Sequence, residues 1–154
     1  MGRTIIKSIA ILFIIALTIV IIVLLRLSPG ETPSIKDENG EKIEGSIAEI
    51  QEMDINGVNQ KIIIRGHNIN KPVLLFIHGG PGAPEYSLFR TYNKELEKKF
   101  IVGYWEQRGA GMSFDGDLFT EDMKIADFVN DAEVVSELLR EQFNKEKIFL
   151  MGHA

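Results

Sequence analysis

The chain contains no cysteine among its 154 residues. It can therefore form neither a disulfide framework nor a lipid-modified cysteine that would hold it on a membrane. The N-terminus does not match an N-myristoylation signal either, because Ile6 stands where that signal requires Ser or Thr. Any attachment of this chain to a membrane must come from the polypeptide itself.

A long apolar run near the N-terminus supplies such an attachment. Residues 9–25 are apolar except for Thr18, and basic residues frame the run on both sides: Arg3, Lys7 and Arg26. A helix rises about 1.5 Å per residue, so this segment nearly covers the ~30 Å hydrocarbon core of a bilayer. The sequence predicts one transmembrane helix, within an N-terminal membrane anchor of residues 1–27.

Two alternatives to an uncleaved anchor are a cleaved signal peptide and a buried helix. The run exceeds the apolar region of about 7–15 residues typical of a signal peptide, and residues 26–30 offer no A-x-A-like cleavage site. Basic residues precede the run and a mainly acidic stretch follows it, which places the N-terminus in the cytoplasm. We expect a single-pass protein of the cell membrane with its C-terminal domain extracytoplasmic.

The charge beyond the anchor excludes one class of partner. Without the three basic residues around the apolar run, 14 of the 17 basic residues remain against 22 acidic ones. Surfaces that bind nucleic acid are rich in Lys and Arg, so no nucleic acid partner is expected. Asp115 and Asp117 are loop carboxylates without a third ligand, and no metal site is predicted.

The remaining sequence divides into a linker and one domain. Residues 28–45 are polar, contain prolines and glycines, and predict a linker. Residues 46–154 form the domain, which opens with two strands joined by Asn56-Gly57, the dipeptide preferred in the turn of a β-hairpin. The strands and helices predicted in this domain are strands 46–55, 58–65, 72–77, 100–105 and 147–151 and helices 87–99 and 125–143.

The alternation of strands and helices after the hairpin predicts an α/β fold with a mainly parallel sheet. The helix over residues 87–99 would bury Leu88, Tyr92 and Leu96, which recur every four residues. The second helix carries a longer apolar stripe: Ile125, Phe128, Val129, Ala132, Val135, Leu138, Leu139 and Phe143. Both helices should cover the sheet with these stripes.

Three loops follow the predicted parallel strands, over residues 78–82, 106–111 and 152–154. The carboxyl ends of parallel strands meet at one edge, where ligands of such sheets bind. Gly109 and Gly111 lack the third glycine of a dinucleotide-binding motif, so no cofactor is expected. In order, the loops read HGGPG, EQRGAG and Gly-His-Ala, and the second continues to Ser113 as EQRGAGMS.

This order resembles the α/β-hydrolase superfamily, in particular its proline iminopeptidase (prolyl aminopeptidase) branch. The resemblance covers about residues 47–154 and implies the N-terminal half of that domain, ending after the fifth strand. It implies that position 154 is the nucleophile, where the family has Ser and this chain has Ala154. It also implies that Gly80 donates its N–H to the oxyanion hole.

The same resemblance gives supporting roles to the other loop residues: His78, Gly79, Pro81, Gly82, Glu106, Gln107, Arg108, Gly109, Gly111, Gly152 and His153. Gly152 is expected in a crowded strand-to-helix turn. The family's acid, base and second oxyanion donor follow position 154, so these 154 residues are predicted to be inactive.

In the complete protein the implied substrate is a small peptide or acyl compound. Alternatives are an esterase, a lactonase or an epoxide hydrolase of the same fold, or a truncated, non-catalytic pseudoenzyme.

Overall fold

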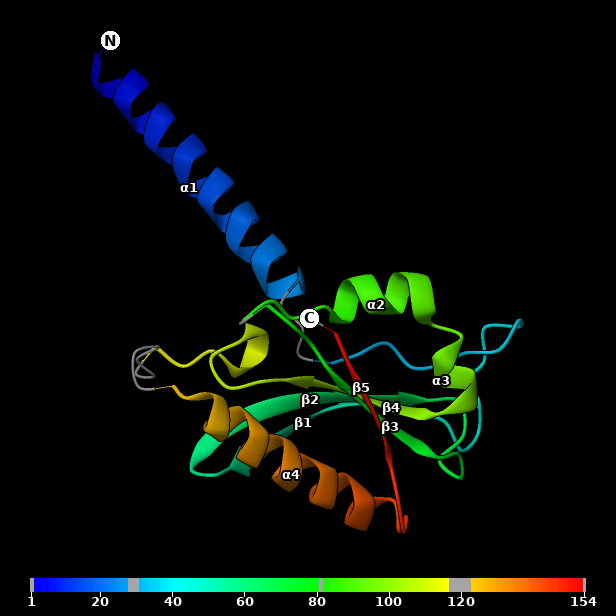
Figure 1. Ribbon diagram of the computed structural model, residues 1–154. Helices are drawn as coiled ribbons and strands as arrows, with labels where there is room; N and C mark the ends of the chain where they lie inside the picture. Colours follow the sequence, from blue (N-terminus) through cyan, green and yellow to red (C-terminus); the bar gives the residue numbers. More distant parts are fainter. Residues whose placement is uncertain (1, 28–30, 81, 117–122, 154) are drawn as a thin grey trace. The chain divides into compact units, whose positions relative to one another are not determined.

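The computed structural model describes residues 2–27, 31–80, 82–116 and 123–153 (Figure 1). The chain divides into two compact units, residues 1–31 and residues 32–154. The first unit contains α1 (Gly2–Leu27), and its residues 7–24 are long and apolar enough to cross a membrane. A signal sequence near the N-terminus would pass the same test of length and composition.

The second unit is built on a five-stranded sheet in the order β1-β2-β4-β3-β5. Its strands are β1 (Ile47–Ile55), β2 (Val58–Gly66), β3 (Val73–Ile77), β4 (Ile101–Glu106) and β5 (Phe149–Gly152). The hairpin strands pair antiparallel, and β2 also pairs antiparallel with β4. The three strands after the hairpin are parallel, with β3 between β4 and β5. The sheet is therefore mixed.

The hairpin turns at Asn56 and Gly57, as the sequence predicts. Their φ angles of 52° and 77° are the two positive values that a type I′ turn requires. The carboxylate of Asp54 also accepts a hydrogen bond from the N–H of Gly57 at 2.9 Å. The register of β1 on β2 follows from this two-residue turn, because Ile55 pairs with Val58 directly beside it.

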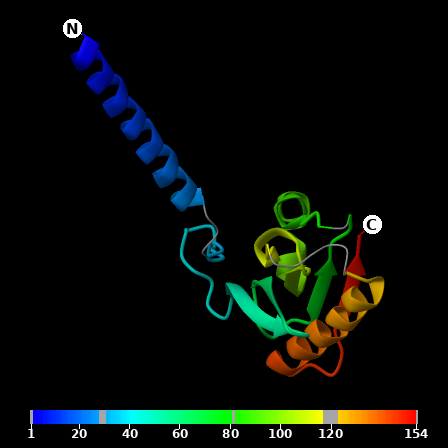
Figure 2. The same ribbon diagram turned by 90° about the vertical axis from the view of Figure 1, so that its left-hand side faces the viewer.

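Helices cover both faces of the sheet (Figure 2). One face packs against α4 (Ile125–Gln142) through Val135 and Leu139, and the other packs against α2 (Tyr86–Asn93) and α3 (Leu96–Lys99). Consecutive side chains of β2 point to opposite faces of the sheet. Ile62 and Ile64 belong to the core under α4, and Ile63 belongs to the core under α2 and α3. A strand buried on both sides explains the unbroken apolar runs in the sequence.

The helix predicted over residues 87–99 is wrong in two respects. It is two helices, α2 and α3, and Leu88 and Tyr92 are 64% and 78% exposed. The side chain that packs is Phe89, whose ring centroid lies 4.1 Å from that of Phe76. Leu96, in α3, also packs on this core, so it is the one of the three predicted positions that contributes to the core.

The linker predicted over residues 28–45 also needs correction from Thr32 onward. Ile35 is buried, and its carbonyl accepts a hydrogen bond from the N–H of Ile43 at 3.0 Å. The N–H of Ile69 donates to the carbonyl of Gly45 at 2.9 Å. The first hydrogen bond folds the polar segment on itself and the second joins it to the domain, which composition does not reveal.

A buried ion pair between Arg65 and Glu97 fastens this segment to the sheet. The Nε of Arg65 lies 3.0 and 3.1 Å from the two carboxylate oxygens of Glu97, and its Nη1 donates to the carbonyl of Pro33 at 2.6 Å. The hydroxyl of Tyr104 donates to the same carboxylate at 3.1 Å. Burial raises the pKa of Tyr104 above its ordinary range, and the charge of Glu97 raises it further.

We predict that Glu97→Ala lowers the free energy of unfolding by about 3–5 kcal/mol, because Arg65 would keep a buried charge without its carboxylate. The matched control is Glu137→Ala, which breaks an exposed pair with Arg140 and should cost less than about 1 kcal/mol. Urea unfolding of the full chain in non-ionic detergent, followed by the fluorescence of Trp105, measures both. Equal, small losses in the two variants would contradict the prediction.

Candidate active site

The three predicted loops lie at one edge of the sheet. In the parallel register Ile77 pairs with Trp105 on one side and with Gly152 on the other, so β3, β4 and β5 end next to one another. Beyond the paired residues, the N–H of His153 donates to the carbonyl of Ile77 at 3.0 Å. Pro81 and Ala154, two of the predicted site residues, lie outside the described residues.

His78 is buried and held between two loops. Its Nε2 lies 3.2 Å from the backbone N–H of Gln107, and its Nδ1 lies 3.1 Å from the carbonyl of Gly79. A backbone N–H can only donate, so Nε2 is the acceptor and Nδ1 carries the proton. The side-chain amide of Gln107 also donates to the carbonyl of His78 at 2.6 Å. Both ring nitrogens are thus engaged within the protein.

Gly80, two residues after His78, has a backbone conformation that favours glycine. Its φ is +92°, and a Cβ atom there would lie 3.0 Å from the Cβ of Ala83. Gly79 is half-buried and Gly80 is exposed, as is Gly82. The role of Gly80 as an oxyanion donor stays a prediction.

The loop after β4 closes on itself through Glu106. Its buried carboxylate accepts a hydrogen bond from the N–H of Met112, in the short helix η1 (Gly111–Ser113). A Cβ atom at Gly111 would overlap this carboxylate, so the position requires glycine. The carbonyl of Glu106 accepts from the hydroxyl of Ser113, which itself accepts from the N–H of Lys61 at 2.7 Å. The loop is thereby fixed to β2.

Arg108 pairs with Asp131, a residue that sequence reasoning missed. Two nitrogens of Arg108, Nε and Nη2, each lie 2.7 Å from a carboxylate oxygen of the fully buried Asp131. The same carboxylate accepts hydrogen bonds from Asn56 at 2.8 Å and Gln60 at 2.7 Å. A signal existed, because Asp131 lies four residues before Val135 on the buried face of α4, where a charge needs a partner.

Gly152 and His153 end the described part of the predicted elbow. A Cβ atom at Gly152 would meet nothing within 4 Å among the described residues. The expected crowding stays a prediction, because the helix that would cause it follows position 154. His153 is exposed, and its Nδ1 lies 2.9 Å from a carboxylate oxygen of Glu85.

Comparison with known proteins agrees with the geometry. No family model matches the chain. Probable aminopeptidase YbaC from Bacillus subtilis is 40% identical over 109 residues, which are 71% of this chain and 34% of that protein. Among solved structures, a proline iminopeptidase-related protein from Thermus thermophilus is 27% identical with a TM-score of 0.56, covering 70% of this chain and 36% of the other.

An epoxide hydrolase from Vigna radiata is 23% identical with a TM-score of 0.55, over 73% of this chain and 32% of its own. The chain belongs to the α/β-hydrolase superfamily. It spans about a third of the length of these relatives. Within the superfamily, the domain is similar in sequence to one probable aminopeptidase, at 40% identity.

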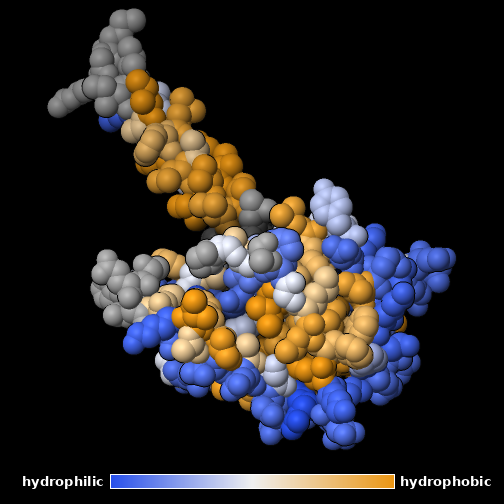
Figure 3. All heavy atoms as spheres, viewed as in Figure 1, coloured by the Kyte–Doolittle hydropathy of each residue, from blue (hydrophilic) through white to orange (hydrophobic). Residues whose placement is uncertain are grey.

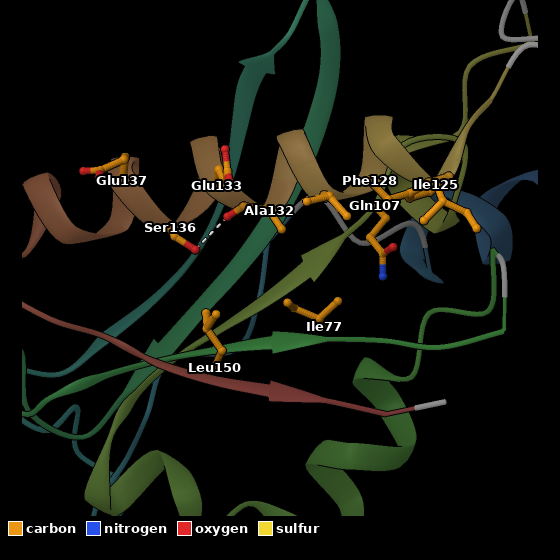
Figure 4. Close-up of a pocket in the computed structure, with 10 residues that line it drawn as sticks. Ile77, Gln107, Ile125, Phe128, Ala132, Glu133, Ser136, Glu137 and Leu150 are labelled. Carbon is orange, nitrogen blue, oxygen red and sulfur yellow. Dashed lines mark hydrogen bonds between the residues drawn. The ribbon is translucent and has the colours of Figure 1, made fainter.

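An apolar groove of about 750 Å³ runs between α4 and the sheet of the hydrolase domain (Figure 4). Ile77 and Leu150 face Phe128 and Ala132 of α4 across it. Figure 3 shows apolar side chains gathered over β5. The predicted stripe of α4 is therefore only partly buried, and Ile125 at its start is 85% exposed.

The charges around Asp131 stabilise its ionised form. Burial by itself would raise the pKa of Asp131, but the hydrogen bonds from Arg108, Asn56 and Gln60 and the charge of Arg108 outweigh it and lower the pKa. The hydrogen bond to Asp131 raises the pKa of Arg108 in turn. Among the described residues, no group of three or more acidic or histidine side chains is placed to hold a metal ion.

We predict that Asp131 makes the stability of the domain pH-dependent. A lowered pKa means that its contribution is complete above the unfolded value of about 3.9 and is lost as the pH falls through the folded value. Asp131→Asn should lower the free energy of unfolding by about 3 kcal/mol at pH 7.

The difference between wild type and Asp131→Asn should then shrink below about pH 4. Urea unfolding between pH 7 and about pH 2.5 measures it, with Glu137→Gln as the control at an exposed carboxylate of α4. A difference that stays constant over this range would contradict the prediction.

Proposed function

We propose that this chain is the N-terminal part of a membrane-anchored serine hydrolase of the proline iminopeptidase type, which cleaves peptide, amide or ester bonds. The observation that carries the proposal is the meeting of three loops, after β3, β4 and β5, at one edge of the sheet. The 40% identity to a probable aminopeptidase supports it. The epoxide hydrolase from Vigna radiata, at 23% identity, shares the fold alone and favours no second function.

The chemistry proposed for the family's active form is acyl transfer to a serine at position 154, where this chain has Ala154. The N–H of Gly80 donates to the negative oxygen of the tetrahedral intermediate, and one such donor contributes about 10²–10³ in rate. The nucleophile needs a base and an orienting acid, which come from sequence beyond the fifth strand. Alanine has no nucleophilic atom, so these 154 residues alone do not hydrolyse the substrate.

The proposed location is the cell membrane, with α1 as a single span. Its residues 7–24 contain Lys7 as their only charged residue. Because basic residues precede the span and acidic ones dominate after it, the N-terminus stays in the cytoplasm and the hydrolase domain lies outside. A small peptide or acyl substrate outside the cell would then reach the loops without crossing the membrane.

We predict that the full chain, expressed in a bacterium, stays in the membrane after high-salt and carbonate washes. Protease added outside the cells should digest its hydrolase domain. The matched variant is the double substitution Ile15→Asp and Ile19→Asp, which adds about 6–8 kcal/mol to the free energy of insertion and should release the chain. A shorter soluble wild-type form that begins near residue 28 would show a signal peptide instead.

The activity can be tested in a chimera in which residues 46–154 replace the matching region of the Bacillus subtilis aminopeptidase. With Ala154→Ser, the chimera should hydrolyse aminoacyl-anilide or short acyl-ester substrates that the parent enzyme accepts. With Ala154, the rate should be lower by about 10³-fold or more.

The 154-residue chain with Ala154→Ser should show no hydrolysis above buffer, because the serine acts as a unit with its base. A folded serine chimera that is inactive beside an active parent would overturn the proposed function. Turnover by the 154-residue variant would overturn the assignment of the base to later sequence.

A further inference from the structure

A continuous series of contacts leads from α4 to the loop of Gly80. Asp131 on α4 holds Arg108 through two hydrogen bonds of 2.7 Å. The residue before Arg108 is Gln107, which holds His78 from two sides, by its N–H to the ring at 3.2 Å and by its side-chain amide to the carbonyl at 2.6 Å. Gly80 lies two residues beyond His78.

The loop of Gly80 has little apolar packing of its own. Gly79 is half-buried, Gly80 is exposed, and neither has a side chain to bury. Glycine loses more conformational freedom on ordering than any other residue, so such a loop needs external restraints. The restraints in the described structure are the hydrogen bonds of Gln107 and the ring of His78, which bonds to the carbonyl of Gly79.

The Asp131 carboxylate is suited to fix Gln107 in place. It is fully buried on a helix of 18 residues, and it accepts from Asn56, Gln60 and both nitrogens of the Arg108 fork. Gln60 is itself held, because its carbonyl oxygen accepts from the indole N–H of Trp105 at 2.9 Å. A bidentate fork fixes the direction as well as the distance of the loop. Functional groups need such support to stay within about 0.5 Å of their working geometry.

We propose that Asp131 is a positioning residue for the oxyanion-hole loop, acting through Arg108 and Gln107 to fix His78 and Gly80. The effect of Asp131 on catalysis rests on the proposed function, whereas the contacts from Asp131 to His78 do not depend on it. Asp131 touches no substrate in this arrangement. Its effect is to hold the N–H of Gly80 where charge develops in the transition state.

A purely structural role for Asp131 makes a different prediction. In that case the ion pair would only stabilise the packing of α4, and any buried ion pair of the domain would serve as well. Glu97→Gln is therefore the matched control, because Glu97, in α3, is also buried and paired with an arginine but contacts β2 and β4 instead of the loops. It should lower global stability without changing the loop of Gly80.

The first experiment measures loop order in the full chain in detergent micelles. We expect hydrogen exchange of the backbone amide of Gln107, which donates to the His78 ring, to accelerate about tenfold or more in Asp131→Asn, at a denaturant concentration where local opening dominates. The ¹⁵N signals of the His78 ring should show the neutral Nδ1–H form in wild type and Glu97→Gln. In Asp131→Asn they should move toward the average of the two tautomers.

Arg108→Lys provides a milder variant if Asp131→Asn does not fold. Lysine keeps the charge opposite Asp131 but loses the fork, so the exchange rates should lie between those of wild type and Asp131→Asn. Unchanged exchange at Gln107 and unchanged His78 signals in either folded variant would overturn the proposal. So would equal acceleration of the Gln107 amide in Glu97→Gln.

The second experiment measures catalysis in the serine chimera described above. Asp131→Asn should lower kcat about 10–100-fold with less than a threefold change in KM, because the lost support acts on the transition state. Glu97→Gln should leave kcat within about twofold of the serine chimera. A fall in kcat/KM that comes from a raised KM, with kcat unchanged, would overturn the positioning role. If the serine chimera itself is inactive, the proposed function fails, and the exchange experiment decides the positioning role independently.

Discussion

The parallel pairing of β3 with β4 on one side and with β5 on the other is the constraint on which the candidate site depends. It aligns Ile77 with Trp105 and Gly152, so that three loops far apart in the sequence begin at one edge. Each of these strands is too short to hold its loop alone. The two cores that cover the sheet, one under α4 and one under α2 and α3, maintain the pairing by burying both of its faces.

Two buried ion pairs fix the orientation of chain segments that lie against this apolar core. Arg65 and Glu97 join the segment after Thr32 to β2 and α3, while Arg108 and Asp131 join the loop after β4 to α4. Burying charges is costly, and apolar residues could fill the same space at no loss of stability. What an apolar pair cannot supply is a fixed orientation of a loop, and both pairs lie where a chain segment without secondary structure meets the sheet.

Several parts of the fold were accessible from the sequence because local rules determine them. The hairpin follows from the turn preference of Asn56 and Gly57, and the strands that end in glycine-rich loops follow from their unbroken apolar runs. The helix over residues 87–99 was less accessible. Its four-residue spacing named Leu88, whereas the aromatic ring of Phe89 packs on Phe76.

The sequence by itself determined the order of elements, the apolar helix α1 and the three loops, since these depend on neighbouring residues and on periodicity. Only the tertiary structure decided which charges meet. Arg108 and Asp131 are 23 residues apart, and Asn56 is 75 residues from Asp131, so no local pattern pairs them. Their meeting follows from the crossing of α4 over the hairpin, because a buried carboxylate must find donors among whatever segments the fold brings to it.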